Sequence, residues 1–84
     1  MQDEASDRDS GKHIELGGVV QGVGFRPFVY NLAVEHGVRG WVRNTSAGVE
    51  LKVAGPAKAV EAFVSALGSR TPPLARIDWI RVED

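Results

Sequence analysis

A short segment with two glycines, residues 21–26, contains the residue types that could do chemistry. Its sequence is Gln-Gly-Val-Gly-Phe-Arg, and a proline follows it. Gly22 and Gly24 let the main chain come close to a ligand, and consecutive backbone amides can then converge on an anion at the start of a helix. Arg26 lies at that helix start, where an exposed cation is unfavourable unless an anion is present. The segment therefore predicts a phosphate-binding loop.

The predicted phosphate-binding residues are Gln21, Gly22, Val23, Gly24, Phe25 and Arg26. Each feature of this loop also has an ordinary structural explanation. A Gly-x-Gly loop alone is as typical of a structural turn as of a binding site. Arg26 alone is more typical of a solvated surface charge than of a ligand-binding cation. The loop by itself leaves this choice open.

The spacing of apolar residues predicts a strand before the loop and a helix after it. From His13 to residue 19, apolar and polar residues alternate, which is typical of a half-buried strand. After the loop, apolar residues recur at helical spacing, and Pro27 fits a first helical turn because its missing amide would be unpaired there. Gly37 is a natural end for this helix. We expect the loop to join the two elements.

The second half of the chain predicts a hairpin and a second helix. Residues 38–44 and 49–53 alternate, and the four residues between them are turn-like. A helix is expected to begin at Pro56, with Gly55 as its cap, and to end at Gly68. We therefore expect two adjacent antiparallel strands followed by a helix.

The last predicted strand, residues 74–82, has an apolar phase that slips near Asp78 and Trp79, which predicts a β-bulge there. The order strand, helix, strand, strand, helix, strand with right-handed crossovers predicts a ferredoxin-like α+β sandwich. Its sheet should be antiparallel, with both helices on one face. Residues 1–12, which are polar and charged, should be a disordered head before one domain at residues 13–84.

Composition excludes several classes of protein. The 84 residues include no cysteine, so disulfides and thiolate-bound zinc are excluded. Ten basic and eleven acidic side chains give a net charge of -1, which does not favour nucleic acid or an anionic membrane as partner. The apolar stretches are much shorter than the ~20 residues that span a bilayer. We expect a cytoplasmic, monomeric domain.

Two separated motifs resemble the signature of acylphosphatases. The first is the loop at residues 21–26, and the second is Gly-Trp-Val-Arg-Asn at residues 40–44, followed by Gly48. The resemblance extends from about residue 14 to residue 82. It implies that Arg26 binds the phosphate, that the loop amides form an oxyanion nest, and that Asn44 orients the attacking water.

Two further stretches are similar to the N-terminal domain of HypF-type carbamoyltransferases of hydrogenase maturation. These are Arg-Pro-Phe-Val-Tyr at residues 26–30 and Thr-Pro-Pro-Leu-Ala-Arg-Ile-Asp at residues 71–78. The resemblance implies carbamoyl phosphate as the substrate and further domains of a larger chain as partners.

The chemistry implied needs neither a cofactor nor a metal ion. An arginine fork can donate two hydrogen bonds to phosphoryl oxygens and stays charged. The leaving carboxylate or carbamate has a conjugate acid with a pKa of about 4, so its departure needs no general acid. Positioning and charge stabilisation can then carry phosphoryl transfer.

Several alternatives remain at this stage. The chain could be a free-standing acylphosphatase, or a non-catalytic phosphate-binding module in which Asn44 merely tolerates a turn. A single-stranded RNA binder on the same fold is disfavoured, because the typical RNA-binding motif and a basic excess are missing. Trp41 and Phe28 are expected to pack, and Arg39 and Arg43 to form a solvated face with Trp41. The isolated histidines, at positions 13 and 36, are expected to be structural or exposed.

Overall fold

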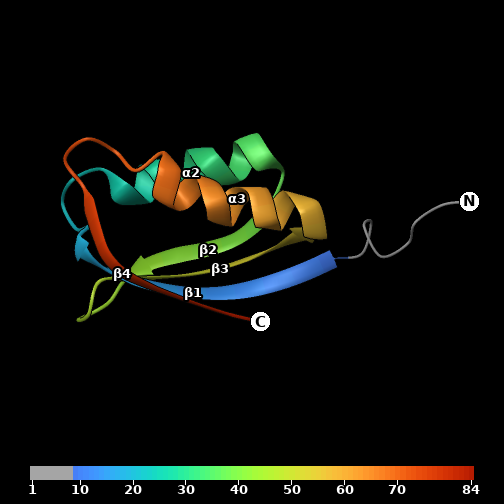
Figure 1. The fold of residues 1–84 in the computed structure, drawn as a ribbon, viewed down its shortest axis with the longest axis horizontal. Coiled ribbons are helices and arrows are strands. Elements are labelled where there is room, and N and C mark those ends of the chain that lie inside the picture. Colours follow the sequence, from blue (N-terminus) through green and yellow to red (C-terminus); the bar gives the residue numbers. More distant parts are fainter. Residues whose placement is uncertain (1–8) are drawn as a thin grey trace, which may run out of the picture.

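Two helices cover one face of a four-stranded antiparallel sheet in this computed structural model, which describes residues 9–84 (Figure 1). The elements are β1 (Asp9–Val19), α2 (Phe25–His36), β2 (Arg39–Asn44), β3 (Val49–Pro56), α3 (Ala57–Ser69) and β4 (Arg76–Glu83). The strands lie in the order β2-β3-β1-β4, and each neighbouring pair is antiparallel. The predicted ferredoxin-like α+β sandwich is confirmed.

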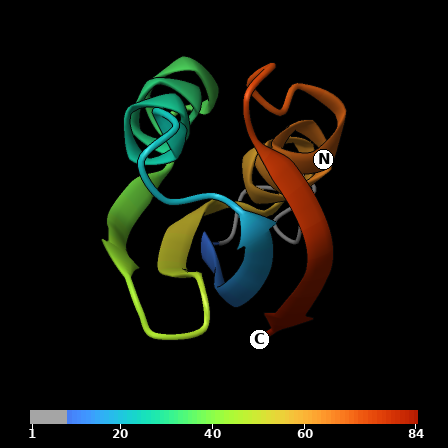
Figure 2. The same ribbon diagram turned by 90° about the vertical axis from the view of Figure 1, so that its left-hand side faces the viewer.

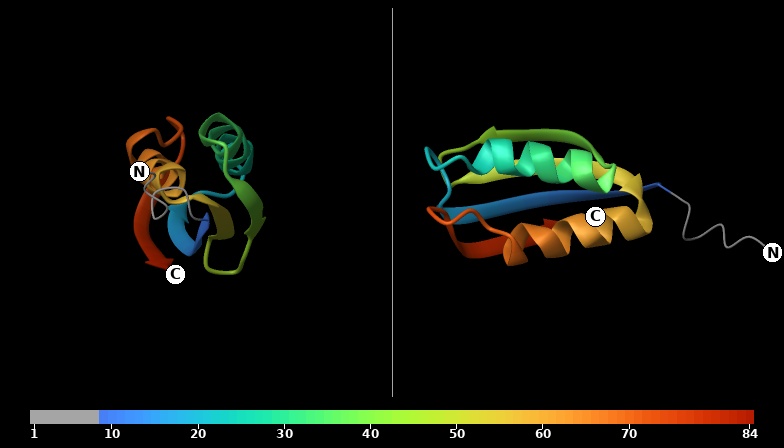
Figure 3. Two further views of the ribbon diagram at one scale, coloured as in Figure 1. Left: turned by 90° about the vertical axis from the view of Figure 1, so that its right-hand side faces the viewer. Right: turned by 90° about the horizontal axis from the view of Figure 1, so that it is seen from above.

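The hydrophobic core lies between the helices and the sheet. Viewed along the strands, α2 stands over the β2 side of the sheet and α3 over the β1 side (Figure 2). From above, the helices run side by side along the direction of the strands (Figure 3). The helices and the central strands bury Phe25, Val29, Leu32, Val60, Phe63, Ala66, Leu67, Ile14, Leu16, Val49, Leu51 and Val53. Burial of these apolar side chains is the main stabilising contribution in a domain of this size.

The predicted irregularity in the last strand is a β-bulge between β1 and β4. Gly17 lies opposite Trp79, and the next residue, Gly18, lies opposite Ile77. Asp78 is therefore the extra residue on β4, as the slipped apolar phase predicted. The bulge restores the facing of the strand, so that Ile77 packs toward the helices.

The first strand begins earlier than the sequence predicted. Residues 9–12 were expected to belong to a disordered head, but Asp9 pairs with Pro56 and Lys12 with Val53 across β1 and β3. Because β3 continues to Pro56, the backbone of residues 9–12 has a strand to pair with. The polar side chains of residues 9–12 gave no sign of this pairing. The remainder of the predicted head, residues 1–8, lies outside the described residues.

The predicted ends of the helices were partly wrong. Gly37 ends α2 in a left-handed conformation, as expected. However, the N-cap of α3 is Pro56 instead of Gly55, and α3 continues past Gly68, with Arg70 as its C-cap. At the start of α3, the pairing of β3 with β1 extends the strand to Pro56. At its end, the packing of α3 overrides the local preference of Gly68 to end a helix.

The last strand also starts later than predicted, at Arg76 instead of residue 74. The amide of Ala75 donates a hydrogen bond of 3.0 Å to the carbonyl of Pro72, which keeps this connection in a turn. Within residues 9–84, neither helix is long and apolar enough to cross a membrane.

Two leucines test the importance of the core with one chemical change. Leu67 on α3 is fully buried, whereas Leu74 in the following connection is 76% exposed. We expect Leu67→Ala to lower the free energy of unfolding by about 2–5 kcal/mol, because it leaves a cavity. Leu74→Ala should change it by less than about 0.5 kcal/mol. Urea unfolding measures both, and equal losses would contradict the assignment of the core.

Candidate active site

The loop between β1 and α2 is anchored at both ends by buried side chains. Val20 is 2% exposed and Phe25 is 1% exposed, so both ends are fixed in the core. Between them, Gly22 and Gly24 adopt left-handed backbone conformations, with φ of 75° and 79°. Side-chain-bearing residues rarely adopt this region, so both glycines are required by the shape of the loop.

The backbone amides of residues 21–26 are available to bind a ligand. Within residues 9–84, none of them donates a hydrogen bond to a backbone carbonyl of the loops and turns. Phe25 and Arg26 begin α2, and the first amides of a helix have no partner inside the helix. The carbonyl of Gly24 accepts the first helical bond, from Phe28 at 3.1 Å. The loop therefore presents free donors at the positive end of α2.

Arg26 differs from the other arginines that the structure describes. Those arginines each pair with a carboxylate: Arg39 with Asp9, Arg43 with Glu50, Arg70 with Glu35, Arg76 with Asp78, and Arg81 with Glu15. Arg26 has no such partner among residues 9–84, and the first turn of α2 contains no acidic residue. Its positive charge therefore adds to that of the helix end, an arrangement that attracts an anion.

A pocket of about 230 Å³ lies in front of these groups. Its lining consists of Val20, Gly22, Gly24, Phe25, Arg26, Pro27 and Asn44. Asn44 is the last residue of β2 and lies opposite the buried Val49 of β3. The sheet thus brings a carboxamide from the second motif to the cation of the first. The pocket is smaller than typical drug-sized sites of about 300–1,000 Å³, which suits a small anion.

Two predicted site residues do not line this pocket. Val23 packs against the core instead. The side chain of Gln21 points toward the β2–β3 hairpin, where its Nε2 donates to the carbonyls of Thr45 at 2.8 Å and Gly48 at 2.7 Å. The roles predicted for residues 21–26 and Asn44 stay predictions. The sequence could not reveal the contact of Gln21, because its partners lie 24 and 27 residues further along the chain.

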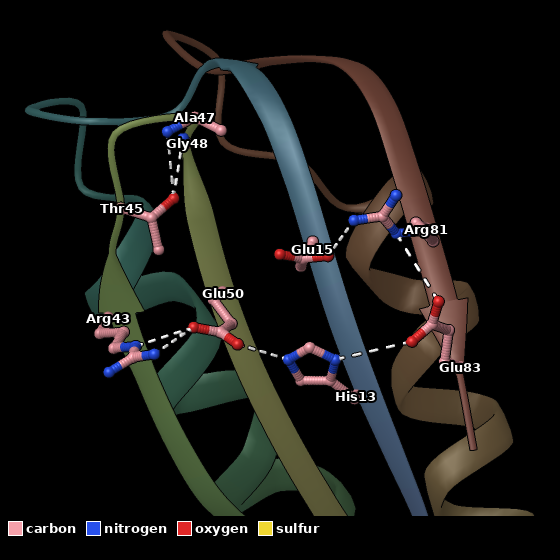
Figure 4. A network of polar contacts seen from close by, with 9 residues as sticks. All are labelled: His13, Glu15, Arg43, Thr45, Ala47, Gly48, Glu50, Arg81 and Glu83. Atoms are coloured by element: carbon pink, nitrogen blue, oxygen red, sulfur yellow. Dashed lines mark hydrogen bonds and ion pairs between the residues drawn. The ribbon is translucent and has the colours of Figure 1, made fainter.

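The hairpin that follows Asn44 has its own tight hydrogen-bonding pattern. The amide of Thr45 donates to the carbonyl of Gly48 at 2.8 Å, and the amide of Gly48 donates back at 3.3 Å. Thr45 Oγ1 also accepts from the amides of Ala47 and Gly48 (Figure 4). A Cβ atom on Gly48 would lie 2.2 Å from the carbonyl oxygen of Leu16, so the hairpin packs closely on β1. This packing explains the glycine at position 48.

Comparison with known proteins identifies the family. The family model named Acylphosphatase matches residues 12–84. The chain belongs to the acylphosphatase family. Its fold also matches an acylphosphatase crystal structure from Bacillus subtilis with a TM-score of 0.78 and 36% identity, covering 87% of this chain and 81% of that one. The predicted resemblance to acylphosphatases is confirmed.

The acylphosphatase domain is similar both to large carbamoyltransferases and to small acylphosphatases. It is 54% identical over 70 residues to carbamoyltransferase HypF2 of Cupriavidus necator, covering 83% of this chain and 9% of that protein. It is 40% identical over 74 residues to the acylphosphatase of Alcanivorax borkumensis, covering 87% of this chain and 79% of that protein. A crystal structure of full-length HypF in a phosphate- and nucleotide-bound form matches with a TM-score of 0.88 and 40% identity, over 92% of this chain and 10% of that one.

The open face of the sheet, opposite the helices, is a solvated face, as predicted. Trp41 is 46% exposed, and the guanidinium carbon of Arg43 lies 5.2 Å from its ring centroid. Arg39 is also exposed on this strand. Phe28 packs instead at the edge of the core, with its ring centroid 5.5 Å from that of Phe25. Among residues 9–84, no three His, Cys, Asp or Glu side chains are grouped so that they could hold a metal ion.

His13 is not isolated, which corrects the prediction for this residue. Its Nε2 lies 2.5 Å from Glu50 Oε2, and its Nδ1 lies 4.0 Å from Glu83 Oε1 (Figure 4). The hydrogen bond from His13, followed by that from Arg43, lowers the pKa of Glu50 below the usual value of 4.5. The pairing of β1 with β3 brings His13 and Glu50 together. They are 37 residues apart in the sequence, so the contact could not be predicted from it. His36 is structural, since its ring lies nearly perpendicular to that of Phe63, with 6.5 Å between the ring centroids.

The lowered pKa of Glu50 predicts a pH dependence of stability. A carboxyl group whose pKa is lowered by folding stabilises the protein above its unfolded pKa, and this contribution disappears as the pH falls through the folded value. We expect Glu50→Gln to be less stable than the wild type at pH 7 and to lose less stability between pH 5 and pH 2. Urea unfolding across this range measures the effect.

The matched control is Glu61→Gln on the exposed surface of α3. It should follow the wild-type pH profile. Part of the acid-induced loss should persist in Glu50→Gln, because ion pairs with arginine also lower the pKa values of Glu35 and Asp78. A Glu50→Gln profile that is parallel to the wild type would contradict the assignment.

Proposed function

We propose that this acylphosphatase domain hydrolyses the carboxyl–phosphate bond of acyl phosphates, with carbamoyl phosphate as its substrate. The observation that carries the proposal is the pocket in which Arg26, which has no carboxylate partner among residues 9–84, and the free amides of Gly22, Gly24 and Phe25 lie beside the carboxamide of Asn44. The first two features suit a phosphoryl group, and the third suits a water molecule held next to it. An acyl phosphate supplies both the anion and an easily displaced leaving group.

In the proposed reaction, the loop amides and Arg26 bind the phosphoryl oxygens and stabilise the charge that they carry in the transition state. Asn44 accepts a hydrogen bond from a water molecule and holds it in line with the bond that breaks. The water oxygen bonds to phosphorus, the bond from phosphorus to the carboxyl oxygen breaks, and the leaving carboxylate keeps the electron pair. The water proton passes to solvent or to a phosphate oxygen, and orthophosphate is released.

We further propose that the domain serves, in the cytoplasm, as the N-terminal part of a HypF-type carbamoyltransferase in nickel–iron hydrogenase maturation. The 54% identity to a carbamoyltransferase supports this assignment. The chain spans only 9% of that relative. The remaining domains of such a carbamoyltransferase are the partners that we propose for this domain.

The second candidate is a free-standing acylphosphatase with a broader range of substrates. The observation that favours it is the match to acylphosphatases over 79% of the length of the Alcanivorax protein. A third candidate is a non-catalytic domain that binds phosphate with the same loop but does not position water.

Phosphate release from acetyl phosphate and carbamoyl phosphate separates these candidates. The proposal predicts turnover of both, with a higher kcat/KM for carbamoyl phosphate. Similar kcat/KM values for both would favour the free-standing enzyme. If no phosphate is released above the spontaneous rate at high protein concentration, but orthophosphate binds saturably, the non-catalytic phosphate-binding domain is the correct candidate.

Arg26→Ala tests the phosphate-binding cation. We expect kcat/KM to fall by at least about 100-fold, the usual scale for removing one preorganised charge-stabilising donor. Orthophosphate, as a competitive inhibitor, should also bind more weakly. The control is Arg39→Ala at the far end of β2, where the arginine pairs with Asp9 outside the pocket. Wild-type kinetics for Arg26→Ala would refute its role.

Asn44→Ala tests the residue that orients water. We expect a fall in kcat of about 10-fold to 100-fold, since a misplaced reactant loses much of the benefit of proximity. The inhibition constant of orthophosphate should change by less than about twofold, because the loop amides and Arg26 are retained. The control is Asn31→Ala on the exposed surface of α2, which removes the same carboxamide away from the pocket. A parallel loss of phosphate affinity would show that Asn44 binds phosphate instead of water.

A further inference from the structure

We infer that the side chain of Gln21 is a positioning residue that sets the place of Asn44 relative to the phosphate loop. This inference rests on the proposed function and adds a residue whose side chain does not line the pocket. The loop of residues 20–24 and the hairpin of residues 45–48 come from separate parts of the chain, and a direct contact between them restrains their relative position. The carboxamide of Gln21 supplies that contact.

The geometry of the contact is specific. Both partners of Gln21 Nε2 are backbone carbonyls, Thr45 at 2.8 Å and Gly48 at 2.7 Å. Only the NH2 side of a carboxamide can serve two acceptors, and both of its hydrogens are then used. Among the described residues, these are the hydrogen bonds that join the loop to the hairpin. Thr45 directly follows Asn44, so the bond fixes the chain one residue beyond the proposed water-binding group.

The hairpin can transmit this restraint because it is internally rigid. The carbonyls that Gln21 contacts belong to the same residues, Thr45 and Gly48, that exchange backbone hydrogen bonds across the turn. Thr45 Oγ1 binds two amides of the turn from within, and Gly48 packs against the backbone of β1. A shift of the hairpin therefore moves Asn44 as well.

The main chain and the side chain of Gln21 have different roles in this arrangement. Its backbone amide stays free in the phosphate loop, whereas its side chain acts on the hairpin. Loss of the side chain should therefore leave the groups that bind phosphate in place and misplace the group that holds water. The expected signature is a fall in kcat with phosphate affinity retained, in a variant that urea unfolding shows to be fully folded under the assay conditions.

The variant that tests the inference is Gln21→Met, which keeps the length of the side chain and removes its donors. We expect kcat with acetyl phosphate to fall about tenfold, since a small displacement of a positioned group costs up to about 100-fold in rate. The inhibition constant of orthophosphate should stay within about twofold of the wild type. The control is Ser46→Ala in the same hairpin, which should keep wild-type kcat.

A double-mutant cycle with Asn44→Ala tests whether Gln21 acts through Asn44. If it does, the double variant loses no more kcat than Asn44→Ala alone, because the positioned group is already gone. If the losses multiply, or if Gln21→Met weakens orthophosphate binding as much as turnover, the inference is wrong. Unchanged kcat in a folded Gln21→Met, as judged by urea unfolding, would also overturn it.

A measurement without turnover separates this inference from the proposed function. If the wild type releases no phosphate, the proposed function fails, but the position of Asn44 can still be followed by NMR. Gln21→Met should shift or broaden the side-chain amide signals of Asn44, whereas Ser46→Ala should leave them in place. Unchanged Asn44 signals in Gln21→Met would overturn the inference whatever the activity.

Discussion

The unneutralised positive charge at the start of α2 is the interaction on which the site depends. Elsewhere among residues 9–84, each arginine has a carboxylate partner, but Arg26 adds its charge to the free amides of a helix end. Such an arrangement is unfavourable without an anion, because a cation then lies at the positive end of the helix dipole. The fold tolerates it because the core holds the loop at Val20 and Phe25. The buried side chains thus stabilise the loop, and its backbone amides need no partner within the protein for that purpose.

The candidate site and the ion pairs of the sheet lie in different parts of the domain. On the open face of the sheet, His13 and Arg43 both contact Glu50, across three neighbouring strands. Surface ion pairs of this kind contribute little each, but they satisfy the charged groups of the face. At the helix end, in contrast, an acidic side chain near Arg26 would compete with a phosphate. The distribution of acidic residues therefore matters as much as the presence of the arginine.

The family match and the geometry of the pocket support one another at different levels of detail. Membership of the acylphosphatase family extends over residues 12–84 and accounts for the fold. The pocket adds which residues lie together: the glycines of the loop that follows β1, Arg26 of α2, and Asn44 at the end of β2. The similarity to both large carbamoyltransferases and small acylphosphatases shows that related domains occur in chains of different length.

The sequence by itself determined the fold class, the bulge at Asp78, the left-handed end of α2 at Gly37 and the position of the loop between β1 and α2. These features follow from local preferences and from the period of apolar residues, which neighbouring residues encode. The start of β1 at Asp9 and the N-cap of α3 at Pro56 were not predicted correctly. Both depend on pairing with a strand that is distant in sequence, and this pairing can override weak local signals.

Only the tertiary structure decided which distant groups meet. The sequence motifs indicated Arg26 and Asn44 through family resemblance, but their common pocket required the crossover that places β2 beside α2. The contacts of His13 with Glu50 and of Gln21 with the hairpin could not be predicted from the sequence, because the type of a side chain does not indicate which distant residue it contacts. Local patterns encode elements, whereas a hydrogen bond between segments depends on how the whole chain packs.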